Sequence, residues 1–364
     1  KAQVLLEKIP NLSIRPMLLT HINDLIDKEI QIESAYDLYG EMVDAWLIRE
    51  EKRVEKIDRK TLLAFSEHLA IDLWINRRQR GSERLTPEEA KALADQWQIP
   101  IQDWQLTGRS LLNRDVIGNL KFAHRSIMEF LFVKRFLEGD KNSKDVSWSD
   151  QMQAFLWEKL PTLPSKANLE GADLSIYQTR LRSSPIAKLE PKQVKAMLFE
   201  KNFYCSKESL TKDWCNPSGG GMEHFFRKEK GGEVVDDYAT GLIWEQSGSE
   251  EMNYENTEKY IKQLNRKGFS GFNDWRLPTL EEAMSLMERV KKGGGLYIDP
   301  VFSKEQGWIW TADRYSASLA WSVGFHYGYC FHDPVANSSH ACVRAVRSGP
   351  TPQAAEQPDG QSSR

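Results

Sequence analysis

The stretch GFNDWRLPT at positions 271–279 decides the fold of the C-terminal part of this chain. It contains Asp, Trp and Arg at 274–276, and an Arg beside a Trp can stack on the ring and donate hydrogen bonds to nearby carbonyls. Such contacts organise folds that are rich in loops, so we expect these three residues to stabilise the fold and not to form a functional site. Thr279 and Glu282 have the spacing of a capping box, which predicts a helix from Leu280 to Met287.

Short aromatic-rich segments separated by glycines surround this stretch. Upstream, ATGLIW at 239–244 follows two valines and predicts a hairpin, and the segment after it has the apolar spacing of an amphipathic helix. Downstream, residues 308–311, 320–325 and 341–347 alternate as strands do. The expected fold is therefore α+β, with two helices around a small twisted antiparallel sheet.

Four motifs in this order resemble the Lcl C-terminal-type domain: ATGLIW (239–244), DWRLPT (274–279), WSVGF (321–325) and VRAVR (343–347). That family is similar in fold to C-type lectins and to formylglycine-generating enzyme. The resemblance implies a C-type-lectin-like ligand-binding domain over residues 233–349. The enzymatic relative uses an active cysteine pair, for which Cys330 and Cys342 are candidates here, but its Arg-Gly-Gly-Ser-Trp type of motif is absent from the sequence. Binding is thus favoured over an oxidoreductase, and a non-switching adhesion module is the third alternative.

The segment from Ser322 to Arg347 has an unusual composition. It lacks Lys, Glu, Gln, Met and Trp, although the rest of the chain is rich in Lys and Glu. Its residues are among those reached by changing the first two bases of an Asn codon, and in this it resembles the variable region of a diversity-generating-retroelement target protein. The alternative is an ordinary Tyr- and His-rich strand and loop, where few Lys or Glu are expected. Tyr, His, Asn and Ser on loops form an adaptable contact surface in either case.

Strand alternation predicts which side chains of this segment face outward. If Trp310, Trp321, Val323, Phe325, Val343 and Val346 are the inward positions, the polar residues between them face solvent or lie on loops. The predicted ligand-binding patch then consists of Tyr315, Ser322, His326, Tyr327, Tyr329, His332, Asp333, Asn337, Ser338 and His340.

The N-terminal part is expected to be mostly helical. Thr86-Pro87 starts one helix, residues 111–122 predict a small hairpin, and 126–137 form an almost wholly apolar last helix. Helices followed by a hairpin and one more helix suggest a winged-helix element. The whole chain is therefore predicted to be multidomain, with a mostly α N-terminal region followed by the α+β C-type-lectin-like domain.

Several strings in this part resemble the helical region that follows the ATPase core of NACHT-type signalling NTPases: RPMLL (15–19), LY (38–39), WL (46–47), RE (49–50) and FAHRSIMEFL (122–131). The resemblance implies a switch that self-associates on activation. No Gly-x-x-x-x-Gly-Lys-Ser/Thr loop occurs in this sequence, so no enzymatic activity is assigned to it. ATP and Mg²⁺ are expected only for an NTPase domain encoded upstream. His124 is predicted to be a structural histidine at a helix start, and a nucleotide sensor is the alternative.

The remaining segments complete four expected parts: a NACHT-associated helical and winged-helix region at 1–140, a connector at 141–232, the lectin-like domain at 233–349, and a disordered tail at 350–364. The connector contains ANLEGADL (167–174), which resembles one coil of a pentapeptide repeat, and a short helix at 191–201. Cys205 and Cys215 within it are expected to be isolated thiols.

Composition sets limits on location and partners. A net charge of −3 over 364 residues offers no general attraction to nucleic acid or anionic membranes. We expect no leader segment, no apolar run of membrane-spanning length occurs in this sequence, and the four cysteines have no zinc spacing. His224, His326, His332 and His340 do not have a metal-ligand pattern. We expect a reduced, cytoplasmic protein that binds a protein or glycan, without metal or cofactor of its own.

Overall fold

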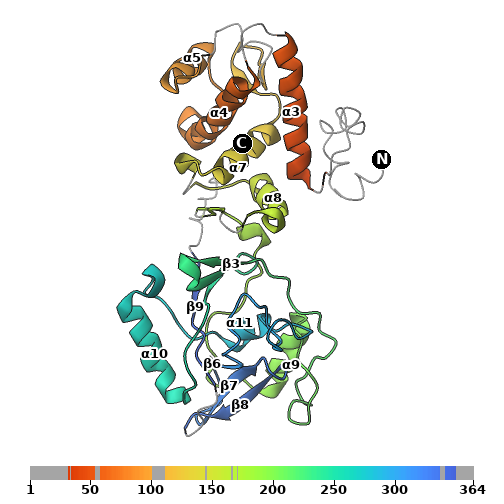
Figure 1. Ribbon diagram of the computed structural model, residues 1–364, viewed down its shortest axis with the longest axis vertical. Helices are drawn as coiled ribbons and strands as arrows, with labels where there is room; N and C mark the ends of the chain where they lie inside the picture. Colours follow the sequence, from red (N-terminus) through yellow and green to blue (C-terminus); the bar gives the residue numbers. More distant parts are fainter. Residues whose placement is uncertain are drawn as a thin grey trace, which may run out of the picture. The chain divides into compact units, whose positions relative to one another are not determined.

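The computed structural model divides the chain into two compact units, residues 1–177 and 178–351 (Figure 1). It describes residues 32, 34–53, 58–100, 111–143, 146–164, 167–169, 171–336 and 341–349. The first unit is helical and the second is rich in β-strands, so an α region followed by an α+β region is confirmed. In the described part of the chain, no helix is long and apolar enough to cross a membrane.

Five α-helices make up most of the described first unit: α3 (Ala35–Arg53), α4 (Arg59–Arg80), α5 (Pro87–Gln96), α7 (Arg125–Leu137) and α8 (Asp150–Lys159). Their ends are set by local chemistry. Asp58 caps α4 by accepting from the Thr61 amide at 2.7 Å, and Gly81 ends it in the left-handed conformation at φ 67°. Thr86 and Glu89 form the capping box of α5. The core contains Tyr39, Phe65, Leu69, Trp74, Phe130, Phe132 and Phe155.

The predicted hairpin and the helix after it are both present. Strand β1 (Leu112–Arg114) pairs antiparallel with β2 (Leu120–Phe122), and α7 follows directly. The Asp115 carboxylate fixes the turn by accepting from the amides of Ile117 and Asn119. Nine side chains of α7 are buried, which is why its sequence is apolar nearly all round.

The boundary between the units differs from the predicted one. Residues 178–232 were expected to belong to a connector, but they lie in the second unit and contribute to its core. Helix α9 (Pro191–Glu200) buries Val194 and Leu198 there, and Phe203 and Trp214 join the same cluster. The short helix was predicted, but its place in this core was not, because the contacts that hold the segment are long-range, such as that of Trp214 Nε1 with the Cys330 carbonyl.

The second unit contains two antiparallel sheets where one was expected. The four-stranded sheet has the order β3 (Phe226–Glu229), β4 (Val234–Asp237), β5 (Leu242–Glu245), β9 (Val346–Ser348). The three-stranded sheet has the order β6 (Trp308–Ser316), β7 (Leu319–Gly324), β8 (Tyr329–Pro334). A parallel bridge between Ile309 and Cys342 connects the second sheet to the segment that leads into β9.

Two helices cover the sheets, as predicted. Helix α10 (Tyr254–Lys267) packs Leu264 against Ile243 and Trp275, and α11 (Leu280–Ser285) packs Leu280 and Met284 against both sheets. Short 3-10 turns complete the described structure: Lys141–Ser143, Leu160–Thr162, Ser175–Tyr177, Lys230–Gly232 and Phe269–Gly271.

The stretch at 271–279 joins these elements. Trp275 is buried and donates from Nε1 to the Phe269 carbonyl at 3.1 Å. Arg276 forms two 2.7 Å bonds to the carboxylate of Glu282, which also completes the capping box with Thr279. Asp274 pairs with Arg347 in β9. The three side chains thus hold the loop to its neighbours, as a scaffold does.

Candidate ligand-binding surface

The segment between β6 and β8 rests on a fully buried core. Trp310, Trp321, Val323, Phe325, Val343 and Val346 are the six positions predicted to face inward, and all six are buried. Trp321 donates from Nε1 to the Leu189 carbonyl at 3.0 Å and meets the Trp214 ring edge to face. Trp310 packs in a separate cluster on the opposite face of the sheet from Trp321 and Val323, so these strands are fixed on both faces by packing and hydrogen bonds.

The β7–β8 turn displays aromatic side chains on this rigid base. The amides of Tyr327 and Gly328 both donate to the Gly324 carbonyl, and Gly328 has φ 78°, which favours glycine. The Tyr327 ring is 57% exposed and stacks at 5.7 Å on Tyr329. Trp308 lies at 5.5 Å from the Tyr329 ring. His326, beside Tyr327, is also exposed.

Two more tyrosines reach the same turn from distant segments. A Cβ placed on Gly328 would lie 3.1 Å from the Tyr297 ring and 3.2 Å from the Tyr204 ring, so the turn rests directly on both. The two rings stack on each other at 5.8 Å. We define the turn surface as Tyr204, Tyr297, Trp308, His326, Tyr327 and Tyr329. Sequence analysis missed Tyr204, Tyr297 and Trp308, because only long-range contacts bring them to the turn.

A second aromatic group lies along β8. The His332 ring stacks between Tyr315 at 4.6 Å and Phe331 at 4.9 Å, with Trp214 close by. Burial lowers the pKa of His332, so its imidazole is neutral at pH 7. Tyr315 and His332 are half-buried and act mainly as cover for Trp321.

Two residues of the predicted patch are not on the surface. Ser322 is fully buried, and its hydroxyl donates at 2.7 Å to the carboxylate of Asp333, which is only 9% exposed. The alternation argument fails here because β7 is the central strand of its sheet and is covered on both faces. Asn337, Ser338 and His340 lie outside the described residues. His326, Tyr327 and Tyr329 are the predicted positions that the structure brings together in the turn surface.

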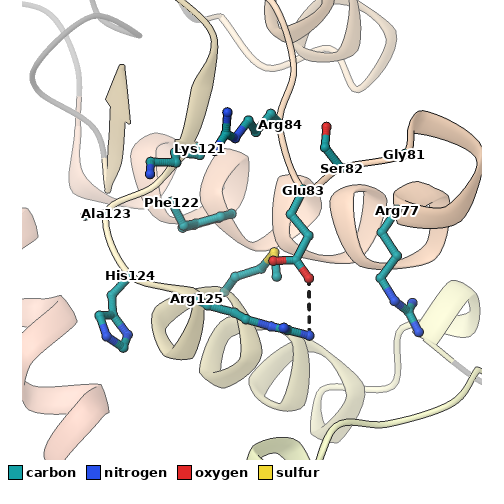
Figure 2. A pocket seen from close by; sticks show the side chains of 11 residues that line it. Arg77, Gly81, Ser82, Glu83, Arg84, Lys121, Phe122, Ala123, His124 and Arg125 are labelled. Atoms are coloured by element: carbon teal, nitrogen blue, oxygen red, sulfur yellow. Dashed lines mark ion pairs between the residues drawn. The ribbon is translucent and has the colours of Figure 1, made fainter. Parts of the chain in front are cut away.

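The first unit contains a separate basic cavity of about 640 Å³ (Figure 2). Its walls carry Arg77, Arg84, Lys121 and Arg125, with Glu83 as the acidic residue of the lining. Arg125 pairs with Glu83 at 3.2 Å, so part of this positive charge is neutralised within the unit. Arg84 pairs with Asp115 at 3.0 Å, so a second of these cations is also neutralised within the unit.

His124 lies at the edge of this cavity and caps α7. Its Nδ1 accepts from the Ser126 amide, and the Ser126 hydroxyl lies 2.6 Å from the same nitrogen. The expected bond to local backbone is therefore present. Within the described ranges, no group of three or more His, Cys, Asp or Glu side chains could hold a metal ion.

Comparison with known proteins identifies the class of the second unit. Residues 233–347 match the family model described as the Lcl C-terminal domain. The Lcl-type domain inferred from the four motifs is therefore confirmed for this part of the chain. The match begins after the segment 178–232, although that segment is part of the same compact unit. No curated protein and no solved structure matches the chain significantly.

Proposed function

We propose that this chain is the ligand-recognition part of a NACHT-like bacterial signalling or defence protein, and that it binds a protein or glycan through a C-type-lectin-like second unit. The turn surface carries this proposal. It combines half-exposed Tyr and Trp rings with a turn backbone that is fixed by hydrogen bonds to the Gly324 carbonyl. Such rings offer a large contact area at a small entropic cost. The surface includes Tyr204, which lies outside the matched family domain.

We also propose that residues 322–347 are diversified by a retroelement. The exposed residues His326 and Tyr327 and the half-exposed Tyr329 are the positions in this segment where replacement costs the core least. The gene offers a direct test. A near-identical template copy should lie near a reverse transcriptase gene, with mismatches confined to template adenines. Mismatches spread over all four bases would remove this part of the proposal.

The first unit would transmit ligand occupancy to an NTPase domain upstream. The succession of helices, the β1–β2 hairpin and α7 agrees with a winged-helix element of the NACHT type. In this proposal the protein is cytoplasmic, ATP and Mg²⁺ belong to the upstream domain, and activation involves self-association. Sequencing upstream of Lys1 tests the idea, because a phosphate-binding loop is expected there.

The alternative function, an oxidoreductase, requires two cysteines that lie close together, and its candidates Cys330 and Cys342 do not. Cys330 pairs with Val323, Val323 with Ile309, and Ile309 with Cys342. Three strand spacings of about 4.8 Å separate the two cysteines, or on the order of 14 Å. Burial also raises the pKa of Cys342 to about 11, which disfavours the reactive thiolate.

The binding proposal is tested by screening the chain against glycan and protein arrays, then measuring the affinity of variants for the ligand found. Tyr327→Ala should weaken binding at least about tenfold, because central aromatic residues dominate such contacts. Phe199→Ala is the matched control, since Phe199 is 55% exposed on α9 and outside the turn surface. Equal affinity of both variants and the wild type would contradict the proposal, as would a copper- and oxygen-dependent activity.

A further inference from the structure

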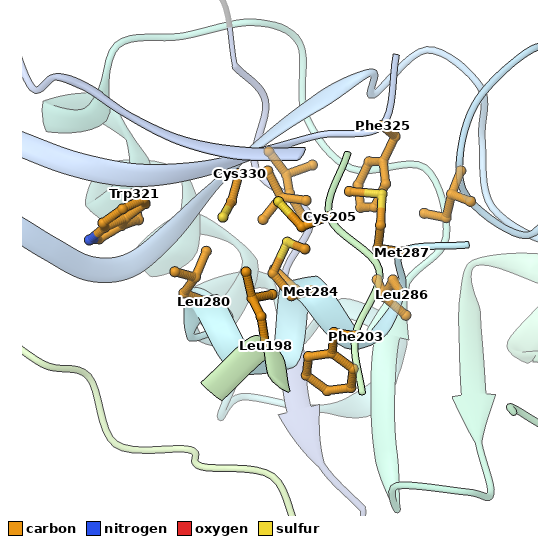
Figure 3. Packing of buried hydrophobic residues seen from close by; sticks show 14 of the residues in the cluster. Leu198, Phe203, Cys205, Leu280, Met284, Leu286, Met287, Trp321, Phe325 and Cys330 are labelled. Carbon is orange, nitrogen blue, oxygen red and sulfur yellow. The ribbon is translucent and has the colours of Figure 1, made fainter. Parts of the chain in front are cut away.

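Two of the four cysteines meet in the core of the second unit. Cys205 and Cys330 are both fully buried and belong to the same apolar cluster (Figure 3). Leu198, Leu280 and Met284 belong to this cluster as well. Cys205 is thus not the isolated thiol that its sequence context suggested.

The backbones that carry the two thiols run side by side. The Ser206 amide donates to the Gly328 carbonyl at 2.7 Å, and the Ser206 hydroxyl donates to the Tyr327 carbonyl at 2.9 Å. Trp214 donates to the carbonyl of Cys330 itself at 3.1 Å. These bonds fix the segment from Cys205 to Trp214 against the start of β8, so the two cysteines are held next to each other in the core.

The pair is chemically asymmetric. A hydrogen bond from the Cys330 thiol is the main cause that lowers the pKa of Cys205, although burial opposes it. Burial raises the pKa of Cys330, and the neighbouring Cys205 raises it further.

We propose that Cys205 and Cys330 are a redox pair that hydrogen peroxide oxidises to a disulfide. The Cys205 sulfur attacks one peroxide oxygen, the O–O bond breaks, and the other oxygen leaves as water with the proton that the Cys205 thiol gives up. The Cys330 sulfur then attacks the resulting sulfenic acid, the S–O bond breaks, and the hydroxyl leaves as a second water with the Cys330 proton. Two thiols lose two electrons in total, and one peroxide becomes two waters.

The disulfide would fasten two segments that are far apart in sequence. It would close a loop between Cys205 on the segment before Trp214 and Cys330 on β8, directly beneath the turn that carries Tyr327 and Tyr329. A cross-link over so long a loop restricts the unfolded chain and opposes local opening. This inference does not rest on the proposed ligand binding, because it concerns the bond alone.

The experiment treats the reduced wild-type chain with hydrogen peroxide, unfolds it, alkylates free thiols and measures intact mass and peptide maps. The expected product has lost about 2 Da, for two thiol hydrogens, and maps to a Cys205–Cys330 bond. Cys342→Ser is the matched control, because Cys342 is another buried thiol of the same unit, and it should form the same product. Cys330→Ser should trap a sulfenic acid that dimedone labels at Cys205, whereas Cys205→Ser should leave Cys330 unlabelled.

Two results would overturn the proposal. One is that Cys205 and Cys330 remain alkylatable while Cys215, which is only partly buried, is oxidised. The other is a disulfide that maps to a different pair. Both readouts use the wild-type chain, so they hold even if a variant fails to fold. Slower amide exchange at Ser206 in the oxidised protein would show in addition that the bond fastens this segment.

Discussion

In the loop at 271–279 the Trp275 ring points into the core, and its Nε1 donates a hydrogen bond to the Phe269 carbonyl within the same unit. At the β7–β8 turn the backbone is also fixed, through the bonds of Tyr327 and Gly328 to the Gly324 carbonyl, yet the Tyr327 ring is 57% exposed. Similar residues thus serve burial in one region and display in the other. Rigidity of a loop alone therefore does not distinguish a loop that stabilises the fold from one that could bind a ligand. The direction in which its large side chains point does.

The largest expected effect is on the scaffold loop. Trp275→Ala should lower the free energy of unfolding by about 3–5 kcal/mol, because it opens a cavity among Val234, Ile243 and Leu264. Urea denaturation followed by far-UV circular dichroism measures it. Trp275→Phe, which keeps most of the volume, should cost clearly less. A loss below about 1 kcal/mol for the alanine variant would show that the loop is not a scaffold.

A smaller effect is expected from the ion pair in the same loop. Arg276→Met leaves the fully buried Glu282 carboxylate without its partner, at a cost of about 2–3 kcal/mol once the 29% exposure of the Arg276 side chain is allowed for. Adding Glu282→Gln removes the unpaired charge and keeps the capping box, so the double variant should recover part of the stability. An equally unstable double variant would argue against this explanation.

Stability should also depend on pH through His224, which links the end of β4 to α11. Its Nδ1 lies 2.8 Å from the Asp237 carboxylate, and its Nε2 lies 2.8 Å from the Ser285 carbonyl. Burial alone would lower the pKa of His224, but these two acceptors outweigh burial and raise it. Because the folded state favours the protonated form, the contribution is complete below the ordinary pKa of about 6.5 and is lost as pH rises through the raised value.

Urea midpoints of the wild type and His224→Gln, measured from about pH 5 to pH 9, test this sign. The difference between the two proteins should shrink as pH rises. Subtraction removes the effect of other groups in this range, such as Asp236, whose pKa burial raises to about 6. A difference that is constant, or that grows with pH, would contradict a raised pKa of His224.

The smallest effect is expected at the turn. Tyr327→Ala should change the free energy of unfolding by no more than about 0.5 kcal/mol, because most of the ring is already in solvent. The same urea denaturation measures it beside Trp275→Ala. A loss comparable to that of the tryptophan variant would mean that Tyr327 is part of the core, and the contrast between loop and turn would disappear.

Local signals allowed much of this fold to be predicted. The Thr279–Glu282 capping box and the Thr86-Pro87 start signal placed two helix starts correctly, since each depends on residues close together in the sequence. The buried face of β7 was also predicted, from its alternation of apolar residues. These features share one property: the residues that decide them are neighbours in the sequence.

The parts that sequence analysis missed depend on contacts between distant segments. Ser322 was placed on the surface because the second cover of β7, which includes Trp310 and Ala341, is not visible in its own alternation. Tyr204 and Tyr297 were missed because each reaches the turn from another part of the chain. The pairing of Cys205 with Cys330 was missed for the same reason, since 125 positions separate them in the sequence.

The burial of β7 on both faces has a consequence for how this protein can change over generations. Any replacement at 320–325 must fit two packed layers at once, so within the segment proposed to be diversified, changes at 322–325 should cost more stability than changes at the turn that follows. If the turn surface binds a ligand as proposed, new specificities come from the few side chains at the end of the strand, such as those of His326 and Tyr327. Under that proposal, the number of exposed positions at the turn limits how many different ligands this fold can recognise.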